Sequence, residues 1–270
     1  MEPFDFLLTK FRKKRTIGLA LSGGSTYGAG HVGVLQVLQE AGIKPDFVAG
    51  TSAGALVGSA YCAGVPLVEI EELFLTLDWP TLVKFSIRKP ISLLDTQPME
   101  AFLKKRLGDI EFKDLKIPFA AIACDIHTGE RVVLDSGPLI PAVRASSAIP
   151  VLFTPVEIGG RLLVDGGIVD DVPVEQLRTM NADFTIVSDV SRKGKISKRP
   201  ENIYEVMMAT IYTMQARISA VDEDACDCYI RTDLSQYSSW GWGDAAKMIA
   251  TGRKSAEAAL PRLKQQLRIK

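Results

Sequence analysis

The sequence has 270 residues, of which 47% are hydrophobic, and it therefore favours one large packed domain over a disordered chain. Its 32 basic and 32 acidic residues cancel, so the net charge gives no reason to expect nucleic acid as a partner. Four cysteines in a chain of this length do not indicate a disulfide framework. With only two histidines beside them a zinc site is not expected, and we predict neither a metal nor a cofactor.

The N-terminal residues 1–15 form a stub in which a short apolar stretch precedes a cluster of basic residues. A second basic cluster spans residues 192–199, and either cluster could contact an anionic membrane surface or simply be solvated. The stub does not resemble a secretory signal, and the apolar stretch over 53–68 is shorter than the roughly 20 residues that a membrane-spanning helix needs. We therefore expect a cytoplasmic protein, with peripheral contact to the inner face of a membrane as an option.

Strands and helices alternate in the first third of the chain. A short apolar run over 16–22 predicts a buried strand, and the spacing of apolar residues predicts a helix over 27–41 that ends at Gly42. A second apolar run over 46–50 predicts another strand, which leads through a tight turn into a helix that ends near residue 63. This alternation indicates an α/β fold with a parallel sheet.

The rest of the chain adds further strands and helices. Between helices predicted over 67–77 and 98–107, residues 84–96 show no clear period and could form a mobile flap. Strands are predicted over 118–125, 131–134, 183–190 and, as a pair around Gly159-Gly160, over 156–164. Helices are predicted over 138–146, 203–220 and 244–267. We expect residues 16–190 to form the catalytic core and residues 191–270 to add helices that pack on the same domain.

A G-x-S-x-G motif, Gly50-Thr51-Ser52-Ala53-Gly54, lies between a predicted strand and a predicted helix. In that context the pattern is typical of a nucleophile elbow, a turn so tight that the backbone of the serine is strained. The flanking glycines supply room where side chains would collide, and the helix that follows directs its free N–H groups at the serine hydroxyl. The motif predicts a nucleophile at Ser52, and the simpler interpretation is a tight turn without chemistry.

A glycine-rich loop, Gly23-Gly24-Ser25-Thr26-Tyr27-Gly28, joins the first predicted strand to the first predicted helix. Backbone N–H groups in such a loop can bind an anion, either a phosphate or the oxyanion of an acyl-transfer intermediate. Ser25 breaks the glycine pattern of a dinucleotide-binding loop, and the sequence has no G-x-x-x-x-G-K-[ST] motif. Nucleotide binding is therefore the weaker interpretation.

The third motif, Asp165-Gly166-Gly167, follows an apolar strand. Its two glycines let another backbone approach closely, which fits a carboxylate presented in a crowded cleft, although the aspartate could also be a simple turn former. A buried carboxyl beside a neutral serine should have a somewhat raised pKa, which would help it to act as a base.

These three motifs resemble, in type and in order, those of the patatin-like phospholipase family. The residues around them agree as well over about residues 16–190, and they are Leu21-Ser22-Gly23-Gly24, His31-Val32-Gly33-Val34-Leu35, Arg144-Ala145-Ser146-Ser147-Ala148-Ile149-Pro150 and Val172-Pro173-Val174. The resemblance implies a three-layer α/β sandwich with a mostly parallel central sheet. It also implies a serine acyl-hydrolase that cleaves carboxylic esters of lipids.

The resemblance assigns roles to the motif residues. Ser52 would attack the acyl carbonyl, and Asp165 would accept its proton with no histidine between them. The oxyanion hole would be formed by Gly23, Gly24 and Ser25 with Ala53, and the remaining motif glycines are Gly28, Gly50, Gly54, Gly166 and Gly167. The chain departs from the family's Gly-Gly-Gly-x-Arg-Gly loop at Ser25 and Tyr27, and the second change removes a positive charge. If Gly24 and Ser25 donate through their backbones, Ser25→Gly should be tolerated or mildly beneficial, because glycine adopts every conformation that serine can.

The two histidines support a dyad. A Ser-His-Asp triad of the α/β-hydrolase kind needs its histidine after the acid, and no histidine follows Asp165. We predict that His31 is a packed or capping residue and that His127 lies at the surface in a hairpin turn. Two other functions stay open, namely a short-chain esterase or thioesterase on the same dyad and a lipid-binding protein whose altered loop no longer catalyses.

Overall fold

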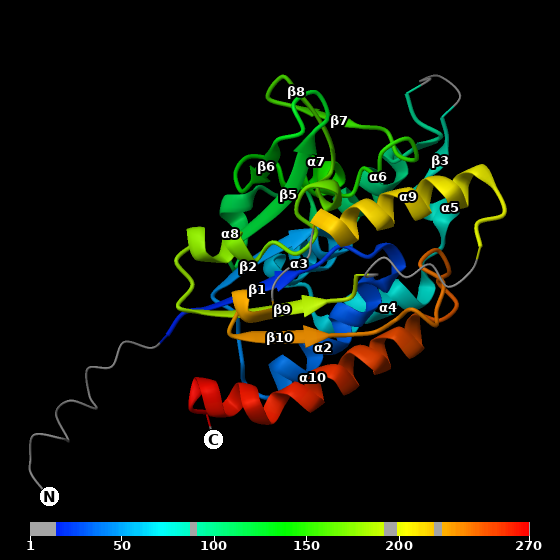
Figure 1. Ribbon diagram of the computed structural model, residues 1–270. Coiled ribbons are helices and arrows are strands. Elements are labelled where there is room, and N and C mark those ends of the chain that lie inside the picture. The colour runs from blue at the N-terminus through cyan, green and yellow to red at the C-terminus, as the bar shows by residue number, and fades with distance from the viewer. Residues whose placement is uncertain (1–14, 87–90, 192–198, 219–222, 270) are drawn as a thin grey trace, which may run out of the picture.

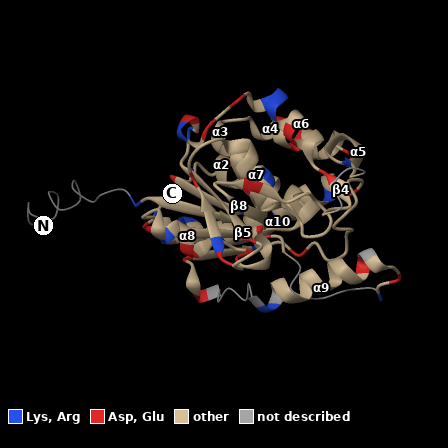
Figure 2. Cartoon of the chain, turned by 90° about the horizontal axis from the view of Figure 1, so that it is seen from above, with Lys and Arg blue, Asp and Glu red and all other residues tan. Residues whose placement is uncertain are grey.

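The computed structural model describes residues 15–86, 91–191, 199–218 and 223–269 (Figure 1). The basic cluster of the N-terminal stub, except Arg15, lies outside these residues, and so does the second basic cluster, except Arg199. Acidic and basic residues are interspersed over the outer helices and loops (Figure 2). No helix within the described ranges is long and apolar enough to cross a membrane.

An eight-stranded mixed sheet forms the centre of the fold. Its strands are β1 (Ile17–Leu21), β2 (Phe47–Thr51), β5 (Phe119–Asp125), β6 (Arg131–Leu134), β7 (Val156–Ile158), β8 (Arg161–Asp165), β9 (Phe184–Asp189) and β10 (Cys228–Arg231). They lie in the order β10-β9-β1-β2-β5-β8-β7, with β6 paired to β5. The five strands from β10 to β5 are parallel to one another, and the pairs that involve β6, β7 and β8 are antiparallel.

Helices flank both faces of this sheet (Figure 1). The α-helices are α2 (Ala29–Glu40), α3 (Ala53–Ala63), α4 (Leu67–Thr76), α5 (Trp79–Leu82), α6 (Gln97–Leu107), α7 (Leu139–Ser146), α8 (Val174–Thr179), α9 (Ile203–Ile218) and α10 (Ala245–Leu267). Helices α2, α3 and α10 bury the larger apolar core against one face, and α8 covers β1, β2 and β9 through a smaller one. The predicted α/β fold with a mostly parallel central sheet is confirmed.

The C-terminal helix α10 lies against α2 (Figure 1), and the contact is close because glycines line it. A Cβ atom added at Gly33 would lie 2.1 Å from the carbonyl oxygen of Ile249. One added at Gly252 would lie 2.0 Å from that of Gly30. Side chains at these positions would push the two backbones apart, so the glycines allow a contact that packs α10 onto the domain.

Short elements account for the differences between prediction and structure. The first predicted helix begins as a separate 3-10 turn, η1 (Ser25–Gly28), before α2 starts at Ala29. The sequence patterns do not predict the helix α8 or the strand β10, which have six and four residues respectively. Within the expected flap, β3 (Lys84–Phe85) pairs with β4 (Leu94–Asp95), and residues 87–90 lie outside the described residues.

Candidate active site

The G-x-S-x-G motif forms the turn between β2 and α3. Ser52 has φ 52° and ψ −118°, a left-handed backbone conformation that costs on the order of 1–3 kcal/mol in a non-glycine residue. A Cβ at Gly50 would lie 2.5 Å from the carbonyl oxygen of Gly54, and one at Gly54 would lie 2.2 Å from that of Leu21. Both glycines are therefore required by contacts with other backbone segments, which hold the strained serine in place.

The hydroxyl of Ser52 donates to a carboxylate that is 113 residues away in the sequence. Its Oγ lies 2.6 Å from Oδ2 of Asp165, which ends β8, and both side chains are buried. The second oxygen, Oδ1, accepts from the N–H of Gly167 at 2.8 Å. A Cβ at Gly166 would lie 2.4 Å from the carbonyl oxygen of Ile122, so the first glycine lets this turn approach β5.

Burial determines the protonation of the carboxyl. Burial raises the pKa of Asp165 from 3.8, and the hydrogen bonds from Ser52 and Gly167 offset part of this rise. The resulting pKa is about 6. The carboxyl is thus ionised at neutral pH and more basic than an exposed aspartate. These are the properties of a group that could accept the proton of a neighbouring hydroxyl.

The glycine-rich loop lies beside Ser52, and its backbone N–H groups differ in what they bind. The N–H of Gly23 donates to the carbonyl oxygen of Asp171 at 3.0 Å, so it is not free to face an oxyanion. Among the hydrogen bonds of the described residues, none is donated by the backbone N–H of Gly24, Ser25 or Ala53. Three of the four predicted oxyanion donors therefore have an N–H with no acceptor among the described residues.

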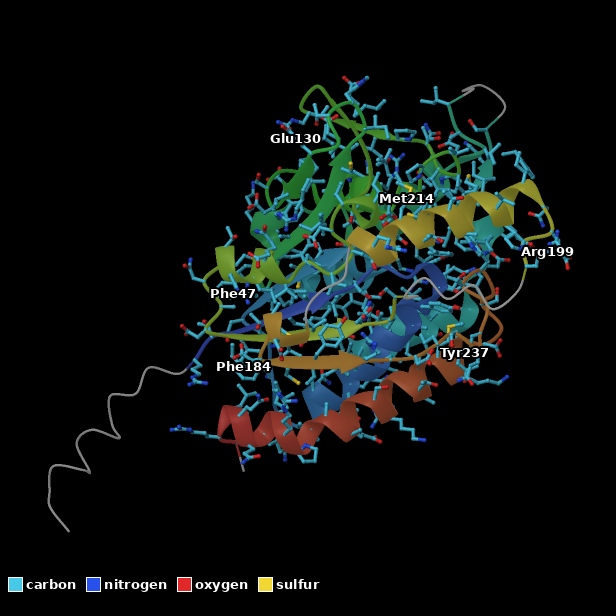
Figure 3. All side chains as sticks on the ribbon, viewed as in Figure 1. Phe47, Glu130, Phe184, Arg199, Met214 and Tyr237 are labelled. Carbon is cyan, nitrogen blue, oxygen red and sulfur yellow. The ribbon has the colours of Figure 1, made fainter. Side chains whose placement is uncertain are left out.

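Tyr27 does not face this site. Its side chain is 1% exposed, and its hydroxyl donates to the carbonyl oxygen of Tyr237 at 2.7 Å. Tyr237 lies in the segment before α10 (Figure 3). The position at which the family usually has a basic residue is here part of the core that joins the loop to the C-terminal segment.

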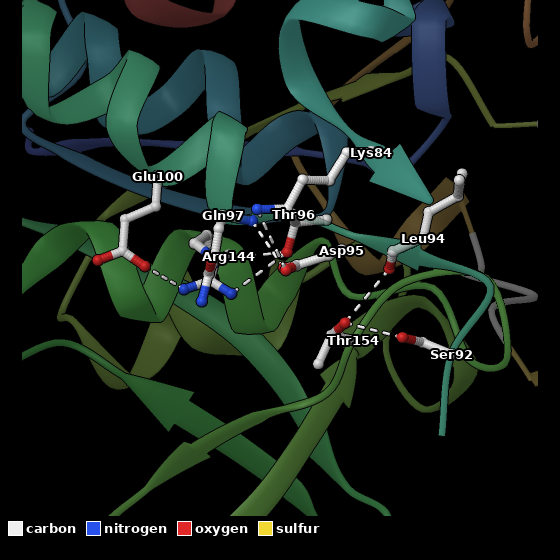
Figure 4. A network of polar contacts seen from close by, with 9 residues as sticks. All are labelled: Lys84, Ser92, Leu94, Asp95, Thr96, Gln97, Glu100, Arg144 and Thr154. Carbon is white, nitrogen blue, oxygen red and sulfur yellow. Dashed lines mark hydrogen bonds and ion pairs between the residues drawn. The ribbon is translucent and has the colours of Figure 1, made fainter. Parts of the chain in front are cut away.

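Two serines outside the three motifs contact the elbow. Ser146 Oγ accepts from the N–H of Ser52 at 3.0 Å and donates to the carbonyl oxygen of Ile122, and Ser147 Oγ donates to the carbonyl oxygen of Ser52 at 3.2 Å. Arg144 lies two residues before Ser146 on α7. Its guanidinium binds Glu100 and Thr96 at the start of α6 (Figure 4). The only signal in the sequence was the match of residues 144–150 to the family.

Neither histidine touches the dyad. His31 is buried, with Nδ1 2.8 Å from Ser188 Oγ and Nε2 2.9 Å from the carbonyl oxygen of Ser22. Burial lowers its pKa to about 4, so the ring is neutral at pH 7, and because a carbonyl only accepts, Nε2 carries the hydrogen. His31 thus links Ser22, which follows β1 and precedes the glycine loop, to Ser188 on β9. His127 is exposed in the turn after β5, as predicted.

The loop after Asp165 connects the three motifs. The carbonyl oxygen of Asp170 accepts from Thr51 Oγ1 at 2.8 Å, next to Ser52, and that of Asp171 accepts from the glycine loop. The carboxylate of Asp170 pairs with Arg131, with 2.6 Å between Oδ2 and Nε. Burial raises the pKa of Asp171 well above its ordinary value, and the nearby carboxylates add to this.

Ser52 lies at the boundary between two pockets. One is apolar, measures about 880 Å³ including its open mouth, and lies among α3, α4, α5 and α6, with Leu56, Ala60, Leu73, Phe74 and Phe102 in its wall. The other measures about 440 Å³ including its open mouth and lies between the glycine loop and α9. Its lining is mixed, with polar residues such as Asp165, Tyr212 and Gln215 beside apolar ones such as Met208 and Ile211, and because it is the more polar of the two we call it the polar pocket. A molecule with one long apolar part and one polar part could occupy both pockets with its central group at Ser52.

The sheet flanked by helices and the buried serine–aspartate pair define an α/β protein with a nucleophile elbow. A family model described as patatin-like phospholipase matches residues 19–178, which is more than half of the chain. The chain therefore belongs to the patatin-like phospholipase family.

Two relatives and one solved structure illustrate this likeness. An uncharacterized NTE family protein of Mycobacterium tuberculosis is 37% identical over 173 residues, which are 63% of this chain and 48% of that protein. The lysophospholipase nte1 of Emericella nidulans is 26% identical over 93% of this chain and 18% of its own length. The crystal structure of VipD from Legionella pneumophila has a TM-score of 0.58 at 16% identity, covering 93% of this chain and 67% of VipD, and it supports the fold alone. The chain thus spans about half the length of the mycobacterial relative and less than a fifth of the length of the fungal one.

Proposed function

We propose that this protein is a serine acyl-hydrolase that cleaves carboxylic esters of lipids, as a phospholipase A or lysophospholipase does. The proposal rests most of all on the 2.6 Å hydrogen bond from Ser52 Oγ to a buried carboxylate with a raised pKa. Membership of the patatin-like phospholipase family and the lysophospholipase named among the relatives support lipid esters as the substrate class.

The first half of the reaction forms an acyl-enzyme. Ser52 Oγ attacks the carbonyl carbon of the ester while its proton passes to Oδ2 of Asp165, and the electron pair of the C=O bond moves onto the carbonyl oxygen. When this tetrahedral intermediate collapses, the bond to the leaving alcohol breaks. The departing oxygen takes the proton from Asp165, so the alcohol leaves neutral and the carboxylate is restored.

The second half hydrolyses the acyl-enzyme. Water attacks the acyl carbon while Asp165 accepts one of its protons, and a second tetrahedral oxyanion forms. Its collapse breaks the bond to Ser52 Oγ, which takes the proton back, and the fatty acid is released. In both halves the negative oxygen needs donors, and we propose for this role the N–H groups of Gly24, Ser25 and Ala53, which donate no hydrogen bond within the described residues.

The two pockets favour a lipid over a short-chain ester or thioester. An acetyl group would contact little of the apolar wall that α3, α4, α5 and α6 form, whereas each buried CH₂ of a long chain adds about 0.8 kcal/mol. The polar pocket beside Asp165 would receive the leaving alcohol and its head group. A protein that only binds lipids would need neither the strained serine nor its carboxylate partner.

Esters of one chromogenic alcohol with acyl chains from two to sixteen carbons would test this function, with a lysophospholipid as the second substrate. We expect kcat/KM to rise with chain length and Ser52→Ala to remove nearly all turnover, because loss of a nucleophile costs many orders of magnitude. A preference for acetyl esters would favour the short-chain esterase. More than about a tenth of the wild-type rate in Ser52→Ala would reject Ser52 as the nucleophile.

A further inference from the structure

Ser25, the first residue of η1, carries two unfavourable features at once. Its Oγ is buried, and the described residues offer it no hydrogen-bond partner. A buried hydroxyl without a partner costs about 1–3 kcal/mol. Its φ is +53°, in the left-handed region that glycine occupies freely and that costs other residues about 1 kcal/mol or more. Glycine at this position would avoid both costs.

The location of the hydroxyl offers a reason for it. Ser25 and Ser52 both line the apolar pocket and the polar pocket, so Ser25 lies at the boundary where the ester group would be. Thr232 is the other described residue whose buried hydroxyl has no partner, and it lines neither of these two pockets. Thr26, which also lines the apolar pocket, donates its hydroxyl to the carbonyl oxygen of Ser238 at 3.2 Å.

We propose that the Ser25 hydroxyl is a side-chain donor of the oxyanion hole. The inference rests on the proposed function, because it concerns the carbonyl oxygen of the ester that Ser52 attacks. Ser25 Oγ–H donates a hydrogen bond to this oxygen as it becomes negative, beside the backbone N–H groups of Gly24, Ser25 and Ala53. No proton is transferred, so Ser25 leaves the balance of the reaction unchanged and lowers the energy of the charged intermediate.

This role explains why the hydroxyl is tolerated without a partner. A donor that is already bonded to the protein would have to break that bond before it could serve the substrate. A donor that the protein holds unbonded gains its partner only when charge develops on the ester oxygen, and such preorganised groups contribute most to the transition state. The expectation from the sequence, that Ser25→Gly is tolerated because of its backbone alone, is therefore revised.

Two substitutions separate the hydroxyl from the backbone. Ser25→Gly removes Oγ and relieves the strain, whereas Ser25→Ala removes Oγ and keeps a Cβ at positive φ. We expect both to lower kcat on a long-chain ester by about tenfold to 10²-fold with little change in KM, somewhat less than the about 10²–10³-fold typical of a principal donor. The melting temperature of Ser25→Gly should equal or exceed that of the wild type. Thr232→Val, which removes the other unpartnered hydroxyl, serves as the matched control and should leave kcat unchanged.

A transition-state analogue supplies a readout that a purely structural role would not change. An alkyl trifluoromethyl ketone adds to the serine and forms a hemiketal oxyanion, so its affinity should weaken in both Ser25 variants by about the factor by which kcat falls. Wild-type kcat and inhibitor affinity in a folded Ser25→Gly enzyme would overturn the inference. If Ser52→Ala stayed active, the proposed function itself would fail, so the two failures are distinguishable.

Discussion

Asp165→Asn should inactivate the enzyme and stabilise its fold. The asparagine amide can keep a hydrogen bond with Ser52 and another with the N–H of Gly167, but it cannot accept the hydroxyl proton. We expect turnover to fall almost as far as in Ser52→Ala, because nothing else is placed to take that proton. At the same time the substitution removes a buried negative charge.

The magnitude of this stabilisation follows from the pKa of the carboxyl. Burial raises the pKa of Asp165 from 3.8 to about 6, a difference of roughly two units at about 1.4 kcal/mol each, or about 3 kcal/mol. Because the folded pKa lies above the unfolded one, the free energy of unfolding falls as the pH rises from about 4 through 6. Asp165→Asn should therefore be more stable than the wild type by up to about 3 kcal/mol at pH 8, and by about half of that at pH 5.

Thermal unfolding of the two proteins at pH 8 and pH 5 measures this difference. For a chain of this size about 3 kcal/mol corresponds to roughly 6 °C in melting temperature. Asp135→Asn, the same substitution at an exposed position, is the control and should leave the melting temperature nearly unchanged at both pH values. If Asp165→Asn is inactive but its gain in melting temperature over the wild type is no larger at pH 8 than at pH 5, the raised pKa of Asp165 is contradicted.

Three further predictions concern the same site and the stub. The acid limb of kcat/KM against pH should fall about tenfold per unit below a pKa of about 6, because only the ionised Asp165 accepts a proton; a profile flat to pH 4.5 would argue against it. Ala60 lines the apolar pocket eight residues after Ser52 on α3, about 12 Å along the helix, so Ala60→Phe should lower kcat/KM for long acyl chains and spare acetyl esters. Equal losses of kcat/KM on long-chain and acetyl esters would mean that the acyl chain binds elsewhere. Removing residues 1–14 should weaken binding to anionic vesicles in a sedimentation assay and leave hydrolysis of a soluble ester unchanged; unaltered binding would mean that these residues are simply solvated.

The sequence predicted those parts of the site that depend on backbone geometry. The glycines around Ser52 and those after Asp165 predicted close backbone approaches, and the structure has these approaches at Gly50, Gly54 and Gly166. The order of the three motifs, through the family resemblance, paired two residues that are 113 positions apart. The first signal is reliable because only glycine fits where two backbones nearly touch.

Side-chain directions within loops could not be predicted in the same way. Tyr27 points into the core because the C-terminal segment supplies the carbonyl of Tyr237, a contact over 210 positions that no local pattern shows. The N–H of Gly23 donates to the carbonyl oxygen of Asp171, which is also far away in the sequence, and no local pattern shows that the Ser25 hydroxyl has no partner among the described residues. Ser146 and Ser147 reach the elbow because α7 packs on β5, and single serines in a short helix carry no periodic signal.

Covalent labelling of Ser52 tests the central claim most directly. A fluorophosphonate probe reacts with a serine hydroxyl only when the protein activates it and stabilises the negative oxygen of the adduct. We expect the intact mass of the wild type to rise by one adduct and a peptide map to place this adduct on Ser52, with slower labelling of Asp165→Asn and none of Ser52→Ala. Undiminished labelling of Ser52→Ala, or an adduct on another serine of the wild type, would contradict the account.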